Sequence, residues 1–172
     1  MNRKSSFAPV VDQRCRILIL GSLPGETSLR ATQYYAHPQN RFWELVGAAI
    51  GIELRPLAYE IRLATLRDHT IGLWDVIADA ERDGSLDSAI RNSRDNDLNS
   101  LVMSLPDLQT IAFNGKTASA IGRKRLKKAK KHLQLVDLPS SSPAYAAMPI
   151  AEKLSRWAVI GGIARNRESA QK

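Results

Sequence analysis

Four short apolar runs that alternate with helix-like patterns constrain the fold of this chain more than any other feature. The runs cover residues 16–20, 71–77, 108–113 and 133–138. Residues 17–20 carry no charge, which is typical of a strand covered on both faces. Strands that alternate with helices form parallel pairs with right-handed crossovers. We therefore expect an α/β fold with three layers, α/β/α, around a four-stranded, mostly parallel central sheet.

Helical spacing of the apolar residues fills the gaps between these runs. It predicts helices over residues 42–50, 56–67, 98–105 and 148–161, and a further helix that starts after residues 114–117. Residues 78–99 are polar and rich in turn-forming residues, so we expect turns there, with a helix start near residues 85–87.

The length of 172 residues and the hydrophobic content of 44% suit a single domain. Both ends lack a periodic apolar pattern, so we expect a flexible N-terminal arm over residues 1–14, one domain over residues 15–162 and a C-terminal tail over residues 163–172. No apolar run approaches the roughly 20 residues of a membrane-spanning helix. We expect a soluble, cytoplasmic monomer with no membrane contact.

The loops that follow the four strands should meet, because the carboxyl ends of parallel strands lie at one edge of a sheet and ligands bind there. The first and longest stretch, residues 21–43, reads GSLPGETSLRATQYYAHPQNRFW. Gly21 and Gly25 allow close approach of a ligand to the backbone, and Pro24 stiffens the turn between them. Tyrosine rings, a histidine and Asn40 add flat faces and polar edges. The sequence thus predicts a ligand site at this edge.

The formal net charge of +8 is concentrated in one segment. Between residues 123 and 132 lie seven cations and no acid: Arg123, Lys124, Arg125, Lys127, Lys128, Lys130 and Lys131. Without them the net charge would be 8 − 7 = +1. Such a block suits nucleic-acid phosphates, and Arg123 and Lys124 are candidate DNA contacts. A solvated helix face is the alternative reading.

Composition argues against several kinds of chemistry. One cysteine and three scattered histidines offer neither a disulfide nor a closed zinc or cluster site, so we expect a reaction without metal or cofactor. The segment GSLPGETS lacks the Lys-Ser/Thr pair of a phosphate-binding P-loop and the third glycine of a dinucleotide fingerprint. A serine hydrolase is poorly supported, because no GxSxG elbow is present.

The strand-exit motifs together resemble a known family. GSLPG, a tyrosine pair, AHPQNRFW, GLWDV, FNGKTA and LPSSSPA are similar to motifs of the uracil-DNA glycosylase superfamily, and within it of the hypoxanthine-DNA glycosylase branch. The mismatch-specific uracil/thymine branch is similar too, with its GINPG and AHPxNRFW. The resemblance covers most of residues 16–157. It implies a DNA repair enzyme that flips a deaminated base, uracil or hypoxanthine, out of DNA and hydrolyses its N-glycosidic bond.

The resemblance also implies roles for residues of the first loop. The superfamily carries an Asp or Asn that positions or activates water at the place where this chain has Leu23. A leucine side chain can do neither. In the hypoxanthine branch this role falls on the asparagine of the AHPQN segment, here Asn40. The neutral Asn40 amide would position water rather than act as a strong base, so backbone donors of Ser22 or Leu23 would carry more of the stabilisation of the leaving base.

Base recognition and DNA contact are placed in the same way. Tyr35 matches the aromatic residue on which the flipped base stacks, and Asp75 falls where the superfamily reads the base edge. Uracil and hypoxanthine each present an N–H beside a carbonyl, which Asp75 can accept from, whereas adenine and cytosine present a bare acceptor nitrogen. The segment that contacts phosphates and the minor groove corresponds to Ser140, Ser141, Ser142 and Tyr145.

Alternative readings stay open at this stage. Asn40 precedes an amphipathic helix and suits an N-cap, Asp75 could cap a helix, and Ser140 to Ser142 could cap the last helix. Because Leu23 replaces the polar residue of the first loop, a non-cleaving DNA-binding module of the same fold is the main alternative function. An enzyme that acts on a free nucleotide is a third, in which the basic run would play no part.

Overall fold

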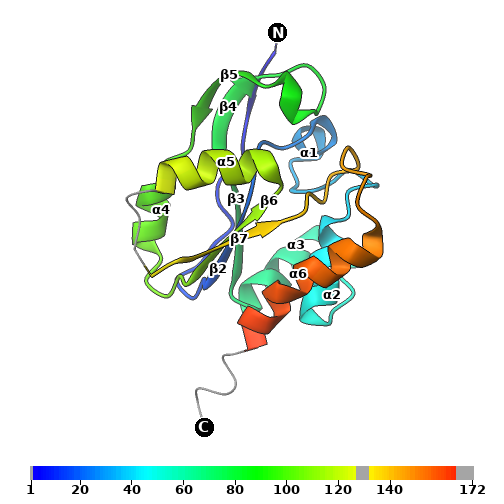
Figure 1. Ribbon diagram of the computed structural model, residues 1–172, viewed down its shortest axis with the longest axis vertical. Coiled ribbons are helices and arrows are strands. Elements are labelled where there is room, and N and C mark those ends of the chain that lie inside the picture. The colour runs from blue at the N-terminus through cyan, green and yellow to red at the C-terminus, as the bar shows by residue number, and fades with distance from the viewer. Residues whose placement is uncertain (1, 127–131, 166–172) are drawn as a thin grey trace.

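The computed structural model describes residues 2–126 and 132–165, and a four-stranded parallel sheet forms its centre (Figure 1). The strand order is β3-β2-β6-β7. Residue Ile17 of β2 lies opposite both Ile71 of β3 and Thr110 of β6, and every pair in this sheet is parallel. The predicted α/β fold and its parallel four-stranded sheet are confirmed, with the strands β2 (Ile17–Gly21), β3 (Ile71–Asp75), β6 (Thr110–Asn114) and β7 (Gln134–Leu138).

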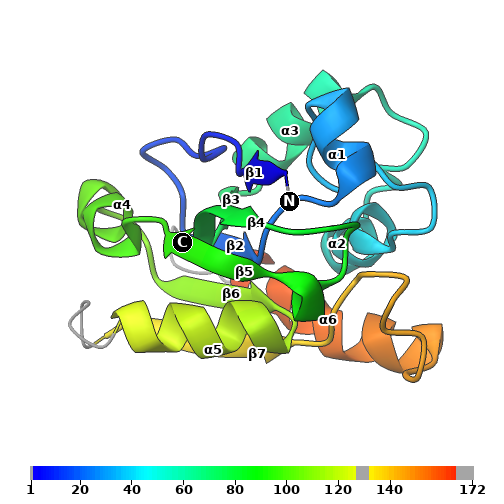
Figure 2. The ribbon, with the colours of Figure 1, turned by 90° about the horizontal axis from the view of Figure 1, so that it is seen from above.

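Helices cover both faces of this sheet, which is why β2 is fully buried. Ile17 and Ile19 point into the core on one side, and Leu18 and Leu20 into the core on the other, because side chains alternate along a strand. Figure 2 shows the two helical layers. The first layer is α2 (Phe42–Ile50), α3 (Tyr59–Asp68) and α6 (Ile150–Arg165), and the second is α4 (Leu98–Ser104) and α5 (Lys116–Arg125).

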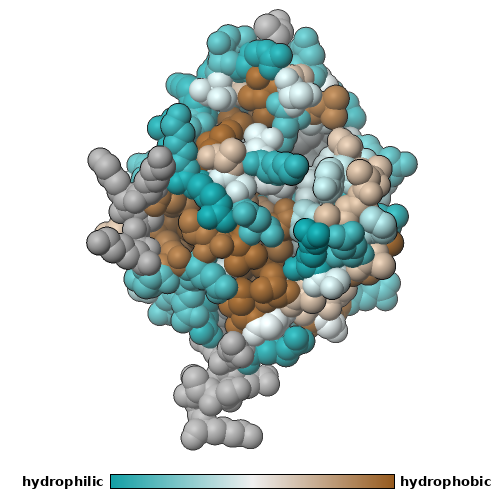
Figure 3. All heavy atoms as spheres, viewed as in Figure 1, coloured by the Kyte–Doolittle hydropathy of each residue, from teal (hydrophilic) through white to brown (hydrophobic). Residues whose placement is uncertain are grey.

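The edge of the parallel sheet is less buried than its centre. β7 is an edge strand, and its Leu135 and Val136 are only half-buried. Figure 3 shows apolar atoms in the middle of one face, with mostly hydrophilic side chains around its outline. Among residues 2–126 and 132–165, none of the helices combines the length and the apolar character that crossing a bilayer requires.

A second sheet corrects the expectation for residues 78–99. Three antiparallel strands, β1 (Arg3–Ser5), β4 (Ile77–Glu81) and β5 (Arg91–Asp95), pair in the order β1-β4-β5. The sequence does not predict these strands, because β5 reads RNSRD and contains no apolar residue. Ion pairs across the sheet replace an apolar pattern, since Asp79 of β4 contacts both Arg3 of β1 and Arg94 of β5. The turn expected over this stretch is confined to η1 (Asp87–Ala89) and its surroundings.

The two ends of the chain also differ from expectation. The described part of the predicted loose arm is paired, because β1 joins the second sheet and Val10 forms a bridge with Leu73. At the other end, α6 extends past residue 162 to Arg165, since Ile163 and Ala164 still pack against the core. Residues 166–172 of the predicted tail lie outside the described residues.

The helices α2 and α6 cross closely, and Gly161 makes this crossing fit. A Cβ atom at Gly161 would lie 1.7 Å from the carbonyl oxygen of Ala49, whereas one at Gly162 would meet nothing within 4 Å. Gly161→Ala should therefore lower the free energy of unfolding by about 1–3 kcal/mol or more, as overpacking does. Gly162→Ala, the matched control, should be neutral or stabilising by about 0.4–1 kcal/mol. Urea unfolding measures both, and equal effects would contradict the close crossing.

Candidate functional site

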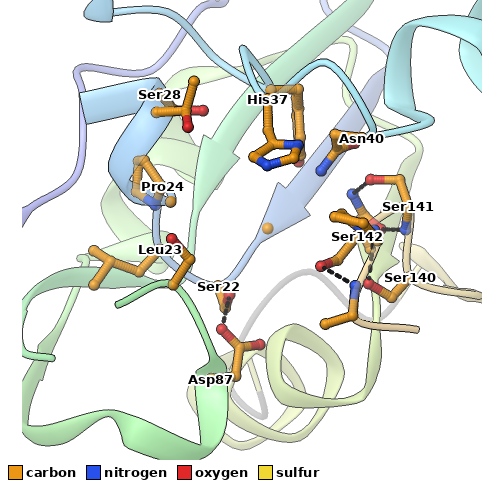
Figure 4. A pocket seen from close by; sticks show the side chains of 18 of the residues that line it. Ser22, Leu23, Pro24, Ser28, His37, Asn40, Asp87, Ser140, Ser141 and Ser142 are labelled. Carbon is orange, nitrogen blue, oxygen red and sulfur yellow. Dashed lines mark hydrogen bonds between the residues drawn. The ribbon is translucent and has the colours of Figure 1, made fainter. Parts of the chain in front are cut away.

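A cavity of about 260 Å³ opens at the carboxyl edge of the parallel sheet, where the segments after β2, β3, β6 and β7 converge (Figure 4). The structure brings nine of the predicted site residues into its lining: Ser22, Leu23, Tyr35, Asn40, Asp75, Ser140, Ser141, Ser142 and Tyr145. Residues far apart in the sequence thus meet where a parallel sheet places its ligands.

The glycine loop (residues 21–25) is fixed from behind by hydrogen bonds to its carbonyl groups. The backbone N–H groups of Val76 and Ile77 donate to the carbonyls of Gly21 and Ser22, at 2.9 and 3.1 Å. The guanidinium of Arg82 donates to the next two carbonyls, those of Leu23 and Pro24. Within the described chain, the N–H groups of Ser22 and Leu23 meet no acceptor. The loop therefore holds two backbone donors ready for a ligand in the cavity.

Arg82 is a functional residue that the sequence analysis missed. Its side chain is fully buried, and its Nε also donates to the carbonyl of Gly84 at 3.1 Å. A buried arginine needs such partners, because an unpaired charge away from water is costly. Arg82 sits in the stretch that read as polar turns, and only the second sheet places it behind the glycine loop.

Leu23 itself contributes its backbone and not its side chain. The side chain is 6% exposed and packs in the core beneath α4 and α5, and Figure 4 shows it directed away from Asn40 and the serines. Its position in the core explains physically why the chain tolerates an apolar residue there. Any polar chemistry at this site must come from other side chains.

Asp75 supplies a carboxyl group that is shut off from water at the end of β3. It is 3% exposed, and its Oδ2 has no hydrogen-bond partner among the described residues. Burial, helped by the nearby charge of Asp87 and opposed by that of Arg82, raises the pKa of Asp75 to about 7. The carboxyl group is thus divided between its neutral and charged forms near neutral pH.

Tyr35 presents one face of its ring to the cavity. The other face stacks on Phe42, with ring centroids 3.8 Å apart and an interplanar angle of 12°. The hydroxyl group is buried, and burial together with the charge of Asp75 raises the pKa of Tyr35, while the nearby amide of Asn114 opposes that rise. The backbone of Tyr35 is left-handed, with φ 55°, a strained conformation that clusters at functional sites.

Gly21 lies between these two polar groups. A Cβ atom there would come within 2.8 Å of Asp75 Oδ1 and 3.0 Å of the Tyr35 hydroxyl. The floor of the cavity therefore combines a carboxyl, a phenol and bare backbone. These groups can form hydrogen bonds with a ligand that enters the cavity.

Asn40 lies between the start of α2 and the cavity. Its Oδ1 accepts a hydrogen bond from the backbone N–H of Phe42 at 2.9 Å, so the side chain satisfies the first N–H of α2 from the position before the N-cap, which is Arg41. Asn40 also lines the cavity, and its Nδ2 has no partner among the described residues. A carbonyl oxygen has two lone pairs, so one acceptor position remains for a water molecule.

The serine loop (residues 140–145) is held rigidly on the opposite wall. The amide of Asn114 makes two bonds to Ser141, donating to its hydroxyl and accepting from its backbone N–H, both at 2.9 Å. The buried Lys153 donates to the carbonyl of Tyr145 at 2.7 Å and lies over the Tyr145 ring. The loop is therefore preformed. Lys153 had no signal in the sequence, because it belongs to the pattern of an ordinary amphipathic helix.

The alternative in which these serines cap the last helix is not what the structure shows. At the start of α6, the backbone N–H groups of Glu152 and Lys153 donate to the carbonyl of Pro149. The serine hydroxyls instead serve the loop, since Ser140 Oγ accepts from the N–H of Ser142 and Ser142 Oγ accepts from the N–H of Ala144.

Arg123 and Lys124 lie apart from the cavity, near the far end of α5. The Arg123 guanidinium contacts the carboxylate of Asp137 at 3.0 Å. Four other cations of the basic run, Lys127, Lys128, Lys130 and Lys131, lie outside the described residues. The predicted DNA contact of this run stays a prediction.

Comparison with known proteins assigns the chain to a family. The chain matches the uracil DNA glycosylase superfamily over residues 8–159. It belongs to that superfamily.

Two similar proteins bear the name hypoxanthine DNA glycosylase. The one from Methanosarcina acetivorans is 49% identical over 115 residues, which is 67% of this chain and 73% of the relative. The one from Methanosarcina barkeri is 45% identical over 114 residues, 66% of this chain and 72% of the relative. A solution NMR structure of a candidate uracil DNA glycosylase from Methanosarcina acetivorans aligns with a TM-score of 0.83 at 40% identity. It covers 94% of this chain and 99% of that protein.

The raised pKa of Asp75 makes the folding stability of the protein depend on pH. The folded pKa of Asp75, about 7, lies above the unfolded value of about 3.9, so folding stability falls as pH rises between these values. Asp75→Asn removes this titration. The stability of Asp75→Asn relative to the parent should therefore increase by up to about 4 kcal/mol from pH 4 to pH 8.

Urea unfolding across this pH range measures the effect. Asp107→Asn, which removes a carboxyl group at an exposed site, is the matched control. A difference between Asp75→Asn and the parent that stays constant with pH would show that Asp75 does not titrate in this range.

Proposed function

We propose that the protein is a DNA glycosylase that flips a deaminated base, hypoxanthine or uracil, out of DNA and hydrolyses its N-glycosidic bond, leaving an abasic site. The observation that carries this proposal is the cavity floor, where the unpartnered carboxyl of Asp75 and the ring of Tyr35 lie on either side of Gly21. The names of the two relatives support hypoxanthine as a substrate.

Base selection follows from the chemistry of Asp75. Uracil and hypoxanthine share an N–H next to a carbonyl, whereas adenine and cytosine have a bare ring nitrogen at that place. A neutral carboxyl group can accept from the N–H and donate to the carbonyl at once. A carboxylate can only accept. Because the pKa of Asp75 is raised to about 7, the neutral form is available near neutral pH, and it pairs with both groups of a deaminated base.

Bond cleavage leaves an electron pair on the departing base and positive character on the sugar. The N–H groups of Ser22 and Leu23, and the proton of neutral Asp75, stabilise the negative charge that develops on the base. Water adds its hydroxyl to the anomeric carbon, and its proton ends on the base or in solvent. Asn40 holds this water through the free acceptor position of Oδ1, which positions the water without removing its proton.

The opposite wall suits the DNA backbone. The hydroxyl groups of Ser140 and Ser142 accept from backbone N–H groups of the loop and can donate to phosphates beside the flipped nucleotide, while the buried Ser141 anchors the loop to Asn114. The basic run that includes Arg123 and Lys124 would attract DNA over a longer range and make binding dependent on salt. We further propose that the protein acts as a cytoplasmic monomer without metal or cofactor.

A non-cleaving DNA-binding module is the second candidate function. The hydrogen bond from the Phe42 N–H to Asn40 Oδ1 favours it, because an asparagine that serves only as a cap would leave no side chain for the water. The buried side chain of Leu23 points the same way, since it removes the polar residue that the superfamily uses there.

Single-turnover release of hypoxanthine and uracil from labelled oligonucleotides tests both candidates, with two variants at position 40. Asn40→Ala should lower the rate by about 100-fold or more, the usual range for a positioned catalytic group. Asn40→Ser keeps a hydroxyl that can cap the helix but is too short to hold the water as well. Thermal melting should show Asn40→Ser as stable as the parent, and its base release should fall as far as that of Asn40→Ala.

Each other outcome has a definite meaning. Full activity in Asn40→Ser would assign Asn40 to capping alone and would require another residue to hold the water. No release from any substrate by the parent, with tight and salt-dependent binding, would establish the non-cleaving module.

A further inference from the structure

The side chain of Arg82 carries a positive charge that no carboxylate in the described chain contacts. It is fully buried, and its hydrogen-bond acceptors are uncharged backbone carbonyls, those of Leu23, Pro24 and Gly84. Arg3 and Arg94 in the neighbouring strands instead form ion pairs with Asp79. A buried cation without an anionic partner costs folding free energy. The cost indicates a use for this charge beyond holding the loop.

The two acids that act most strongly on Arg82 are each engaged with another residue. Asp87 Oδ1 accepts from the Ser22 hydroxyl at 2.7 Å, and Glu26 forms an ion pair with Lys4. Burial lowers the pKa of Arg82, and both acids oppose this effect. An arginine stays protonated at neutral pH in any case. The charge of Arg82 is therefore present, and no contact neutralises it on its own side of the glycine loop.

One residue of the glycine loop separates this charge from the cavity. Arg82 Nη1 donates to the Leu23 carbonyl at 3.3 Å, and the N–H of Leu23 meets no acceptor in the described chain. Ser22, Leu23 and Pro24 follow one another along the side of the cavity in Figure 4. The charge is felt inside the cavity, because Arg82 opposes the rise that burial causes in the pKa of Asp75. An interaction across buried protein is only weakly screened.

We propose that the buried charge of Arg82 stabilises the negative charge that develops on the base as its bond to the sugar breaks. This inference rests on the proposed function and adds to it a positioning residue, which acts through the glycine loop and does not touch the base. A cation interacts weakly with a neutral base that is still bound to the sugar. It interacts strongly with the departing base, which keeps the electron pair of the broken N-glycosidic bond. The gain therefore arises in the transition state, where it raises the rate.

Pairs of bases that are nearly equal in size but differ in the stability of their anions test this role. 5-Fluorouracil leaves more readily than uracil, and 8-azahypoxanthine more readily than hypoxanthine, because fluorine and the added ring nitrogen withdraw electrons. Arg82→Met removes the charge. It should slow single-turnover release of the poorer leaving base by about 10- to 100-fold. Release of the better leaving base should slow less, so the ratio of the two rates should rise by about threefold or more.

Arg82→Lys separates charge from geometry, because it keeps the charge and loses the guanidinium fork. Its overall rates should fall, but the ratio between the two bases should stay within about twofold of the parent. Equal slowing of both bases in Arg82→Met would overturn the proposal and leave Arg82 as a support of the loop. A ratio that rises equally in Arg82→Lys and Arg82→Met would also overturn it, since the effect would then come from loop geometry.

Arg14→Met is the matched control, because it removes the same charge at the opposite edge of the parallel sheet. Arg14 precedes β2, and its exposed guanidinium pairs with Asp12. Neither rate should change in this variant. A ratio that rises in Arg14→Met as much as in Arg82→Met would assign the effect to net charge and overturn the role of the buried cation.

A titration of the protein alone separates this inference from the proposed function. Carbon NMR of labelled aspartate carboxyl groups follows Asp75 without DNA. Arg82→Met should raise the pKa of Asp75, because the opposing cation is gone, whereas Arg82→Lys should leave it close to that of the parent. The other titratable side chains in this part of the cavity are the same in all three proteins: Tyr34, Tyr35, His37 and Asp87.

An unchanged pKa of Asp75 in a folded Arg82→Met would show that the charge does not reach the cavity, and would overturn the inference. Failure of the proposed function would appear differently, as no base release by the parent.

Discussion

The chemistry of the cavity depends on one carboxyl group, that of Asp75, which is buried at the end of β3. Asp75 is 3% exposed and has an oxygen without a partner in the described chain, an arrangement that costs folding free energy. The chain limits the cost by raising the pKa of Asp75, so that the group is partly neutral at neutral pH. A neutral carboxyl group is both a hydrogen-bond donor and an acceptor. A deaminated base has the complementary pair, a carbonyl that accepts and an N–H that donates. Gly21 leaves room beside it, and Tyr35 supplies the flat surface.

The second sheet makes this arrangement rigid. Arg82 directly follows β4 and donates to the carbonyls behind the glycine loop, and Asp87 in the β4–β5 loop accepts from the hydroxyl of Ser22. The parallel sheet thus gathers the site, and the antiparallel sheet holds its floor and one side of its mouth. On the other side, Asn114 and Lys153 hold the serine loop. Little of the site depends on a loop that must become ordered on binding, which favours affinity.

Sequence reasoning reached the parallel sheet and its carboxyl edge because β2 and β3 are almost purely apolar. The family motifs then pointed to Tyr35, Asn40 and Asp75, which the structure brings into one cavity. The second sheet was out of reach, since β5 carries charges where a strand pattern requires apolar residues. The burial of Arg82 and Lys153 could not be predicted for a related reason. A buried cation is recognised by its hydrogen-bond partners, and here these are backbone carbonyls distant in the sequence. The hydrogen bond from the Phe42 N–H to Asn40 Oδ1 is likewise a contact that a sequence does not show.

The pH dependence of hypoxanthine release from duplex DNA under single-turnover conditions tests the central claim, that neutral Asp75 reads the base, most directly. The parent rate should fall as pH rises through about 7, because the carboxylate loses the proton that it donates to the base carbonyl. Asp75→Asn should remain active, with a rate that no longer falls in this range, since an amide is donor and acceptor at every pH. A parent rate that instead rises through pH 7, or an inactive but folded Asp75→Asn, would contradict the account.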